Sequence, residues 1–296
     1  MLITKCAVPA LAVILSQSQP SEAFSPTNGR ATFGFRSRSR QLSSLSMSME
    51  PLHASLVTTL TERLGLVTTD FTEVYGGQNW ECPSTGAKGS AEWIAESSPK
   101  FLTGMTSSTT TSTSGEDLTI NVWMGPSYDV PHLLLTFGEQ ADGGCAVTAD
   151  YIVRGSTPIG GDPQYVEVYY GGEDGAVGAW TAAFGLEGAV PLPPPAEFET
   201  RLIASPACLA VGGIEKSEAE AIAKAHVERW LGWVESSQPV MARLRGSFNL
   251  RDDKLRQYFF RGQLSKNCKL YGEDLGRTVA AVNTGPTAEA YVGGGS

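Results

Sequence analysis

The stretch VPHLLLTFGEQADGGCAVTADYIV, from Val130 to Val153, constrains the fold most strongly, because it contains two runs predicted to be β-strands joined by a loop. Successive side chains of a strand point to opposite faces. One face of the first strand is mixed and carries His132, Leu134 and Thr136, so it could line a pocket. The other face is wholly apolar and is predicted to pack under a helix. It is formed by Leu133, Leu135 and Phe137.

The second strand of this hairpin carries Thr148 and Asp150 on one face. A shift of one residue in strand register would move both to the opposite side of the sheet, so the sequence alone does not fix whether Asp150 joins His132. If they do join, a histidine beside a carboxylate can act as a proton donor near neutral pH. The alternative is that Asp150 ends a strand and binds a backbone amide, while His132 is a satisfied edge residue.

The order of the other elements predicts an α+β fold with a central antiparallel sheet, because strands are grouped in the middle and helices lie at both ends. Leucines recur every fourth residue in 51–66, which indicates an amphipathic helix. Helices are also predicted from Ser217 and over EDLGRTVAAVN, and strands over GSAEWIAES and from Leu118. The polar, low-complexity segment Thr103–Asp117 is predicted to be a disordered or hairpin-tip loop.

The N-terminal residues have the composition of a two-part targeting sequence. Residues 1–23 contain a lysine, a short apolar run and a small-residue exit, which is typical of a signal peptide. Residues 24–48 are rich in serine and arginine and lack acids, as plastid transit peptides do. This predicts delivery to the stroma of a plastid, and the alternative is secretion with a basic linker. The domain is then predicted to span 49–285, followed by a flexible tail at 286–296.

Charge and motif content exclude several classes of function. The chain has a net charge of −9, and residues 1–47 hold five of its 22 basic and one of its 31 acidic residues, so the remainder carries −13. Nucleic-acid binding is therefore not expected, nor is a membrane span after the leader. The five cysteines form no CxxC pair, so we expect neither a disulfide framework nor a zinc site. No GxGxxG, P-loop or GxSxG motif is present.

Several segments in order resemble the red chlorophyll catabolite reductase family, which is related to the ferredoxin-dependent bilin reductases. They are VPHLLLTFG, TADYIVRG, DPQYVEVYY and KLYGEDLGRTVAAV, within about Gly89 to Val282. The resemblance implies an α–β–α sandwich that holds an open-chain tetrapyrrole between the sheet and the C-terminal helices. It also implies electrons from reduced ferredoxin and no bound metal or flavin. The substrate contacts that we expect are Leu134, Thr148 and Gln263.

The resemblance also indicates that this chain departs from the family at its acids. Thr136 stands where the family usually has Glu or Asp, and the segment RGQLSKNCK before Tyr271 contains no acid. Threonine cannot replace a carboxylic acid, although its hydroxyl can hold a water or a pigment carbonyl. Asp150, His132 or a bound water would have to donate the proton, so the candidate catalytic residues are Asp150, His132 and Thr136.

A basic C-terminal region is predicted to dock the acidic ferredoxin. Residues 240–280 contain nine basic and four acidic residues, a local charge of +5 in an acidic chain. The alternative is a solvated helix face, which is common. The candidate docking residues are Arg251, Lys254, Arg256, Arg261, Lys266 and Lys269.

These observations predict a plastid, ferredoxin-dependent reductase of a linear tetrapyrrole. The alternative is a tetrapyrrole-binding protein without catalysis, either a pigment carrier or an accessory component of a photosynthetic complex. Thr136 favours this alternative, and the basic C-terminal region favours the reductase. A lipocalin-like chromophore lyase is a weaker candidate, because the long helix from Ser217 does not fit a plain barrel.

Overall fold

A nine-stranded antiparallel sheet forms the centre of the fold in our computed structural model. The structure describes residues 48–69, 79–96, 102–113, 115–141, 143–154 and 163–285. The strands lie in the order β1-β3-β4-β5-β6-β7-β9-β8, and β2 pairs with β3. Their bounds are β1 Leu66–Thr69, β2 Asn79–Glu81, β3 Lys88–Glu96, β4 Leu102–Ser112, β5 Gly115–Met124, β6 His132–Glu139, β7 Cys145–Ile152, β8 Val190–Pro191 and β9 Leu209–Ile214.

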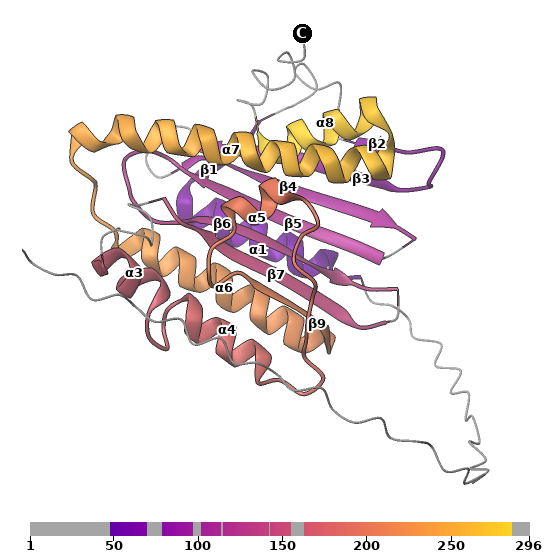
Figure 1. The fold of residues 1–296 in the computed structure, drawn as a ribbon, viewed down its shortest axis with the longest axis horizontal. Helices are drawn as coiled ribbons and strands as arrows, with labels where there is room; N and C mark the ends of the chain where they lie inside the picture. The colour runs from indigo at the N-terminus through magenta and orange to yellow at the C-terminus, as the bar shows by residue number, and fades with distance from the viewer. Residues whose placement is uncertain are drawn as a thin grey trace, which may run out of the picture. The chain divides into compact units, whose positions relative to one another are not determined.

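Helices cover both faces of this sheet (Figure 1). The helices α1 and α6 pack on one face against β5, β6 and β7, while α8 contacts β3 and β4 on the other and α7 packs on α8 and α5. The bounds are α1 Glu50–Leu64, α3 Pro163–Tyr170, α4 Ala176–Phe184, α5 Phe198–Ile203, α6 Lys216–Ser236, α7 Ala242–Tyr271 and α8 Glu273–Thr284. The layers are therefore α–β–α, with an antiparallel sheet between helices, as predicted.

The main core lies between the sheet and the helices α1 and α6. The leucines spaced by four in α1 are buried there, as are Leu133, Leu135 and Phe137 of β6. Trp230 of α6 is fully buried, and its indole Nε1 donates a hydrogen bond to the backbone oxygen of Pro131 at 2.8 Å. This bond ties α6 to the start of β6. The predicted apolar face of β6 is confirmed, which leaves the mixed face of the strand for the other side of the sheet.

The prediction of a loop over Thr103–Asp117 is wrong, because this segment supplies most of β4 and the start of β5. The two strands pair from Leu102 with Met124 to Ser112 with Gly115. Threonine is β-branched and suits a pleated strand between two neighbours. The hydroxyls are also satisfied: Thr109 Oγ1 lies 2.9 Å from Ser90 Oγ, and Thr106 Oγ1 donates to the Val282 backbone oxygen at 3.4 Å.

The longest helix in the described part of the chain, α7, is not predicted as a single element from the sequence. It has 30 residues, and its buried side of Phe248, Phe259 and Phe260 is interrupted by the buried polar residues Asp252 and Arg256. A mixed stripe of this kind gives a weak helical pattern.

The helix predicted from Ser217 begins one residue earlier, at Lys216. Glu215 and Glu218 form a capping box, in which the side chain of each residue accepts the backbone N–H of the other. The backbone N–H of Glu215 donates to Glu218 Oε2 at 2.9 Å. The residue that caps α6 is therefore Glu215.

The predicted signal peptide (1–23), nearly all of the transit peptide (24–48) and the tail (286–296) lie outside the described residues. In the part of the chain that the structure describes, no helix is both long enough and apolar enough to cross a membrane.

Candidate functional site

The register of β6 and β7 decides which candidate residues share a face. Leu134 pairs with Asp150, and Thr136 pairs with Thr148. Residues paired across two strands point to the same side of a sheet. Thr136, Thr148 and Asp150 therefore lie together on the face away from α1 and α6, on the same side as His132.

A cavity of about 530 Å³ lies above this face. Its floor includes Leu134, Thr136, Thr148 and Asp150, and its roof is formed by one side of α7, including Gln263. The proline-rich connection between β8 and α5 supplies part of the wall, from Leu192 to Glu197. Small-molecule sites are commonly cavities of about 300–1,000 Å³ with a few polar groups. All three predicted substrate contacts line this cavity.

Four hydroxyl side chains form a row across the floor. Ser108 of β4 pairs with Thr119 of β5, Thr119 with Thr136 of β6, and Thr136 with Thr148 of β7. All four line the cavity. The Oγ1 atoms of Thr119 and Thr136 lie 3.1 Å apart and share a hydrogen bond. Thr136 therefore belongs to a hydroxyl floor that can donate or accept hydrogen bonds, but that cannot supply an acidic proton.

Asp150 is the buried acid of the cavity. Its Oδ2 accepts the backbone N–H of Ser205 at 3.0 Å, whereas its Oδ1 has no hydrogen-bond partner. Burial raises the pKa of Asp150 to about 6, although the hydrogen bonds from Ser205 oppose this shift. The carboxyl is thus partly protonated near neutral pH, and it lies buried at the floor of the cavity. A group of this kind can donate a proton to a ligand.

His132 shares this face of β6 but does not line the cavity, which corrects its assignment to the site. Its Nδ1 accepts the backbone N–H of Met124 at 2.9 Å, and its Nε2 lies 3.1 Å from Asp252 Oδ1. Nε2 therefore carries the ring proton. The side chain is fully buried against Trp123, and burial lowers its pKa to about 4. At neutral pH His132 is an uncharged structural link between β6 and α7.

Asp252 connects α7 to the sheet through this histidine and Arg154. Arg154 is fully buried, and its Nε donates to Asp252 Oδ1 at 3.0 Å. Its remaining donors reach the backbone oxygens of Tyr128 and Gly125 at 2.6 and 2.9 Å. Burial acts to raise the pKa of Asp252, but its partners His132 and Arg154 reverse this and hold it at about 2. The cluster fixes the helix that roofs the cavity.

The candidate docking residues separate into three environments. Arg251, Lys254, Arg261 and Lys269 are exposed on α7. Arg256 is buried, and its guanidinium donates to the Thr284 backbone oxygen at 2.8 Å and lies over the ring of Trp123. It is therefore unavailable to a protein partner, and its assignment as a docking residue is wrong.

The third environment is that of Lys266, which lines the cavity. Sequence reasoning also missed several other polar residues of the site, because no local motif marks them. Asn283 of α8 lines the cavity, and its Oδ1 is buried without a partner. Asn121 of β5 lines it too and donates from Nδ2 to the Asn283 backbone oxygen at 3.3 Å. Only the fold brings these residues to Asp150.

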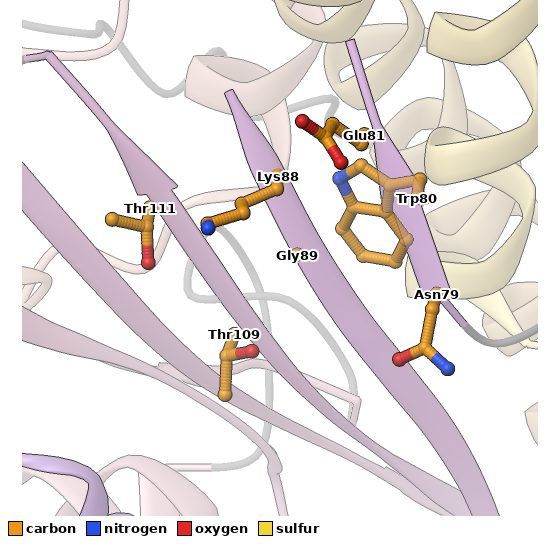
Figure 2. A pocket seen from close by; sticks show the side chains of 7 residues that line it. All are labelled: Asn79, Trp80, Glu81, Lys88, Gly89, Thr109 and Thr111. Carbon is orange, nitrogen blue, oxygen red and sulfur yellow. The ribbon is translucent and has the colours of Figure 1, made fainter. Parts of the chain in front are cut away.

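A second hollow, of about 510 Å³, lies at the edge of the sheet over β2, β3 and β4. Figure 2 shows the Trp80 indole beside Gly89, with Lys88 extending toward the strand that carries Thr109 and Thr111. Gly89 is required by this approach, since a Cβ there would lie 2.7 Å from the indole. The charged residues of this hollow, Glu81 and Lys88, are exposed. The cavity at Asp150 is the better candidate, because it holds a buried titratable group.

Comparisons with known proteins identify the fold. No family model matches the chain, and no curated protein matches it. Among solved structures, the chain is similar to selenomethionine-labelled phytochromobilin synthase from tomato in complex with biliverdin, with 17% identity and a TM-score of 0.61. The match covers 80% of this chain and 83% of that one. At this identity the similarity shows the fold, and it confirms the predicted α–β–α arrangement.

Within the described ranges, no group of three or more His, Cys, Asp or Glu side chains is placed to hold a metal ion.

Proposed function

We propose that the protein reduces a linear tetrapyrrole with electrons from ferredoxin, as the resemblance to red chlorophyll catabolite reductase implies. The observation that carries the proposal is Asp150, a buried carboxyl of raised pKa on the floor of a cavity of suitable size. The similarity in fold to a phytochromobilin synthase solved with biliverdin supports the class of ligand. The composition of residues 1–48 supports a plastid location.

The chemistry would proceed in single-electron steps. Reduction of one double bond of the pigment takes two electrons, each from one reduced ferredoxin, and two protons. Asp150 donates the first proton to the carbon on which negative charge develops, and the carboxylate that results takes a proton from water and delivers it to the pigment as the second. The raised pKa of Asp150, at about 6, suits both steps near neutral pH. The pigment itself is the electron acceptor, so no bound redox group is needed.

The floor and roof of the cavity would hold the pigment flat between them. Leu134 offers an apolar surface, and the hydroxyls of Thr136 and Thr148 offer hydrogen bonds to its carbonyl oxygens. Gln263 can reach the opposite side of the ligand from α7.

Ferredoxin would dock on the outer side of α7. Arg251, Lys254, Arg261 and Lys269 are exposed on this helix and form a local positive surface in an acidic chain. Complementary charge increases the rate of association of such partners. Because α7 also roofs the cavity, a ferredoxin bound there would lie one helix away from the pigment.

The second candidate is a protein that binds the pigment without reducing it. Thr136 favours this candidate, because it replaces the acid that the family usually has at this position of the floor. The cavity and the hydroxyl row would serve a carrier equally well.

An anaerobic assay separates the two candidates. The full chain is mixed with red chlorophyll catabolite and reduced ferredoxin, and absorption and product fluorescence are followed. Loss of the red pigment with formation of a fluorescent product, dependent on this protein, supports the reductase. A stable bound-pigment spectrum without turnover supports the carrier, and no spectral change at all contradicts both.

A further inference from the structure

The first two turns of α7 place no side chain in the protein core. Residues 241–247 are all exposed, and Phe248 is the first buried residue of the helix. In Figure 1 this end of α7, in orange, extends past the ends of the central strands. Helical turns that pack on nothing are only marginally stable in water, because most helical stability in a protein comes from packing of an apolar side. A surface that covered this end would stabilise it.

The exposed end continues the apolar stripe of the helix. Leu244 lies one turn before Phe248, and Met241 precedes Leu244 by three residues, which is the spacing of one helix face. Phe248 is buried, with the guanidinium carbon of Arg154 at 5.1 Å from its ring centroid. Leu244 is 41% exposed and Met241 is 61% exposed. The stripe therefore runs from the core out into the solvent.

Arginines accompany this stripe, and no acid lies among them. Residues 241–251 contain Arg243, Arg245 and Arg251 and no aspartate or glutamate. All three arginines are exposed. The first acid along the helix, Asp252, is buried in an ion pair with Arg154, so it does not neutralise them. This end of α7 thus carries a local charge of +3 in a chain of net charge −9.

The chain enters α7 at a fixed point, so the projecting turns are held in one direction. The backbone N–H of Val240 donates to the backbone oxygen of Ser127 at 2.8 Å. Asp129, in the same loop, accepts the hydroxyl of Tyr169 at 3.2 Å and is held there, away from the helix end.

We propose that residues 241–251 bind a membrane surface that carries anionic lipids. An apolar side with arginines beside it is typical of a helix that lies in the interface of a bilayer, where the apolar side chains enter the lipid and the arginines reach the headgroups. An acidic protein would pair with the arginines, but it would need a groove to cover Leu244 and Met241 on a projecting helix end. Lipid adapts to such a convex shape. This binding is independent of the proposed reduction.

Vesicle binding by the full chain tests the proposal. Vesicles of phosphatidylcholine with about 30% phosphatidylglycerol are compared with phosphatidylcholine alone, and bound protein is separated by flotation. We expect binding to the anionic vesicles at low ionic strength and severalfold weaker binding at about 0.5 M salt. Leu244→Ser and Arg245→Gln are each expected to weaken it about fivefold. Two matched controls are expected to change nothing: Leu250→Ser, at a 72% exposed position on the other side of α7, and Lys224→Gln, at an exposed base of α6.

Quenching by brominated lipid locates the contact. Residues 1–48 also contain an apolar run and arginines, so vesicle binding by itself does not assign the contact to α7. Leu244→Trp and Leu250→Trp each add one indole, and brominated lipid is expected to quench the added fluorescence in the first variant only. Equal quenching in both variants, or equal vesicle binding by Leu244→Ser and wild type, overturns the proposal. If Leu244→Ser weakens ferredoxin binding and leaves vesicle binding unchanged, the surface serves an acidic protein and the proposal fails.

Discussion

Asp150, on the floor of the cavity, accepts the backbone N–H of Ser205 through Oδ2 at 3.0 Å, while its buried Oδ1 has no hydrogen-bond partner. The bond to Ser205 orients the carboxyl. An unpaired buried oxygen is costly for a fold. This cost is explained if Oδ1 carries the proton of the neutral carboxyl or accepts a hydrogen bond from a bound ligand.

Replacement of Asp150 by asparagine tests its role as proton donor. Asparagine keeps the shape and the acceptor for Ser205, but it has no proton to give at neutral pH. We expect Asp150→Asn to bind the pigment within about threefold of wild type and to lose turnover by about 100-fold or more. The measurement is single-turnover reduction by pre-reduced ferredoxin. Unchanged turnover in Asp150→Asn would remove Asp150 from the mechanism.

The same substitution makes a prediction for stability. The pKa of Asp150 is raised from 3.8 to about 6, so its carboxyl favours folding fully below pH 4 and loses this contribution as the pH rises through 6. Asp150→Asn is therefore expected to gain stability relative to wild type between pH 4 and pH 8, by about 2 kcal/mol. Urea unfolding at both pH values measures this. The exposed control Glu187→Gln is expected to show no such pH-dependent gain. If the difference in unfolding free energy between Asp150→Asn and wild type were the same at both pH values, the raised pKa of Asp150 would be contradicted.

Restoration of an acid on the floor tests whether the second candidate function applies. A glutamate in Thr136→Glu would enter the cavity beside other carboxylates, which raises its pKa and makes it a proton donor. We expect a gain in turnover of about tenfold with little change in pigment affinity. Thr119→Glu, at the neighbouring position of the same hydroxyl row, is the matched control and is expected to give no gain. Equal gains in both variants would show that the position of the acid does not matter.

Gly262 tests the packing that closes the cavity. A Cβ at Gly262 would lie 2.2 Å from Thr200 Oγ1, so alanine must shift the Thr200 side chain or move α5 away from α7. We expect Gly262→Ala to reduce the free energy of unfolding by about 1–3 kcal/mol and to weaken pigment binding. Gly246 lies in the same helix, and a Cβ there would meet no atom within 4 Å, so Gly246→Ala is expected to stabilise by about 0.5–1 kcal/mol. Urea unfolding of both variants measures the two changes, and the same sign for both would contradict the close α5–α7 contact.

The sequence predicted the faces of the first strand of the central hairpin well, because Leu133, Leu135 and Phe137 are apolar while His132 and Thr136 mark the other side. It could not place Asp150, since the side on which that residue lies depends on the register with Leu134. The sequence also could not identify Asp252 as the partner of His132, because the two residues are 120 positions apart and no local pattern links them. The interpretation of Thr103–Asp117 as a loop failed for a different reason. Polarity alone does not separate irregular structure from a β-branched polar strand, which here serves as the floor of a polar cavity.

The most direct test of this account is a pigment titration with a variant that fills the cavity. Thr148→Trp places a large side chain on the floor beside Asp150, and Leu250→Trp adds the same ring at a position of α7 that is 72% exposed. Biliverdin is titrated into wild type and both variants, and the shift of its absorption band is followed. The account predicts saturable binding at one site in wild type and in Leu250→Trp, and a loss of at least about tenfold in affinity in Thr148→Trp. Equal binding in all three proteins would show that the pigment does not occupy this cavity.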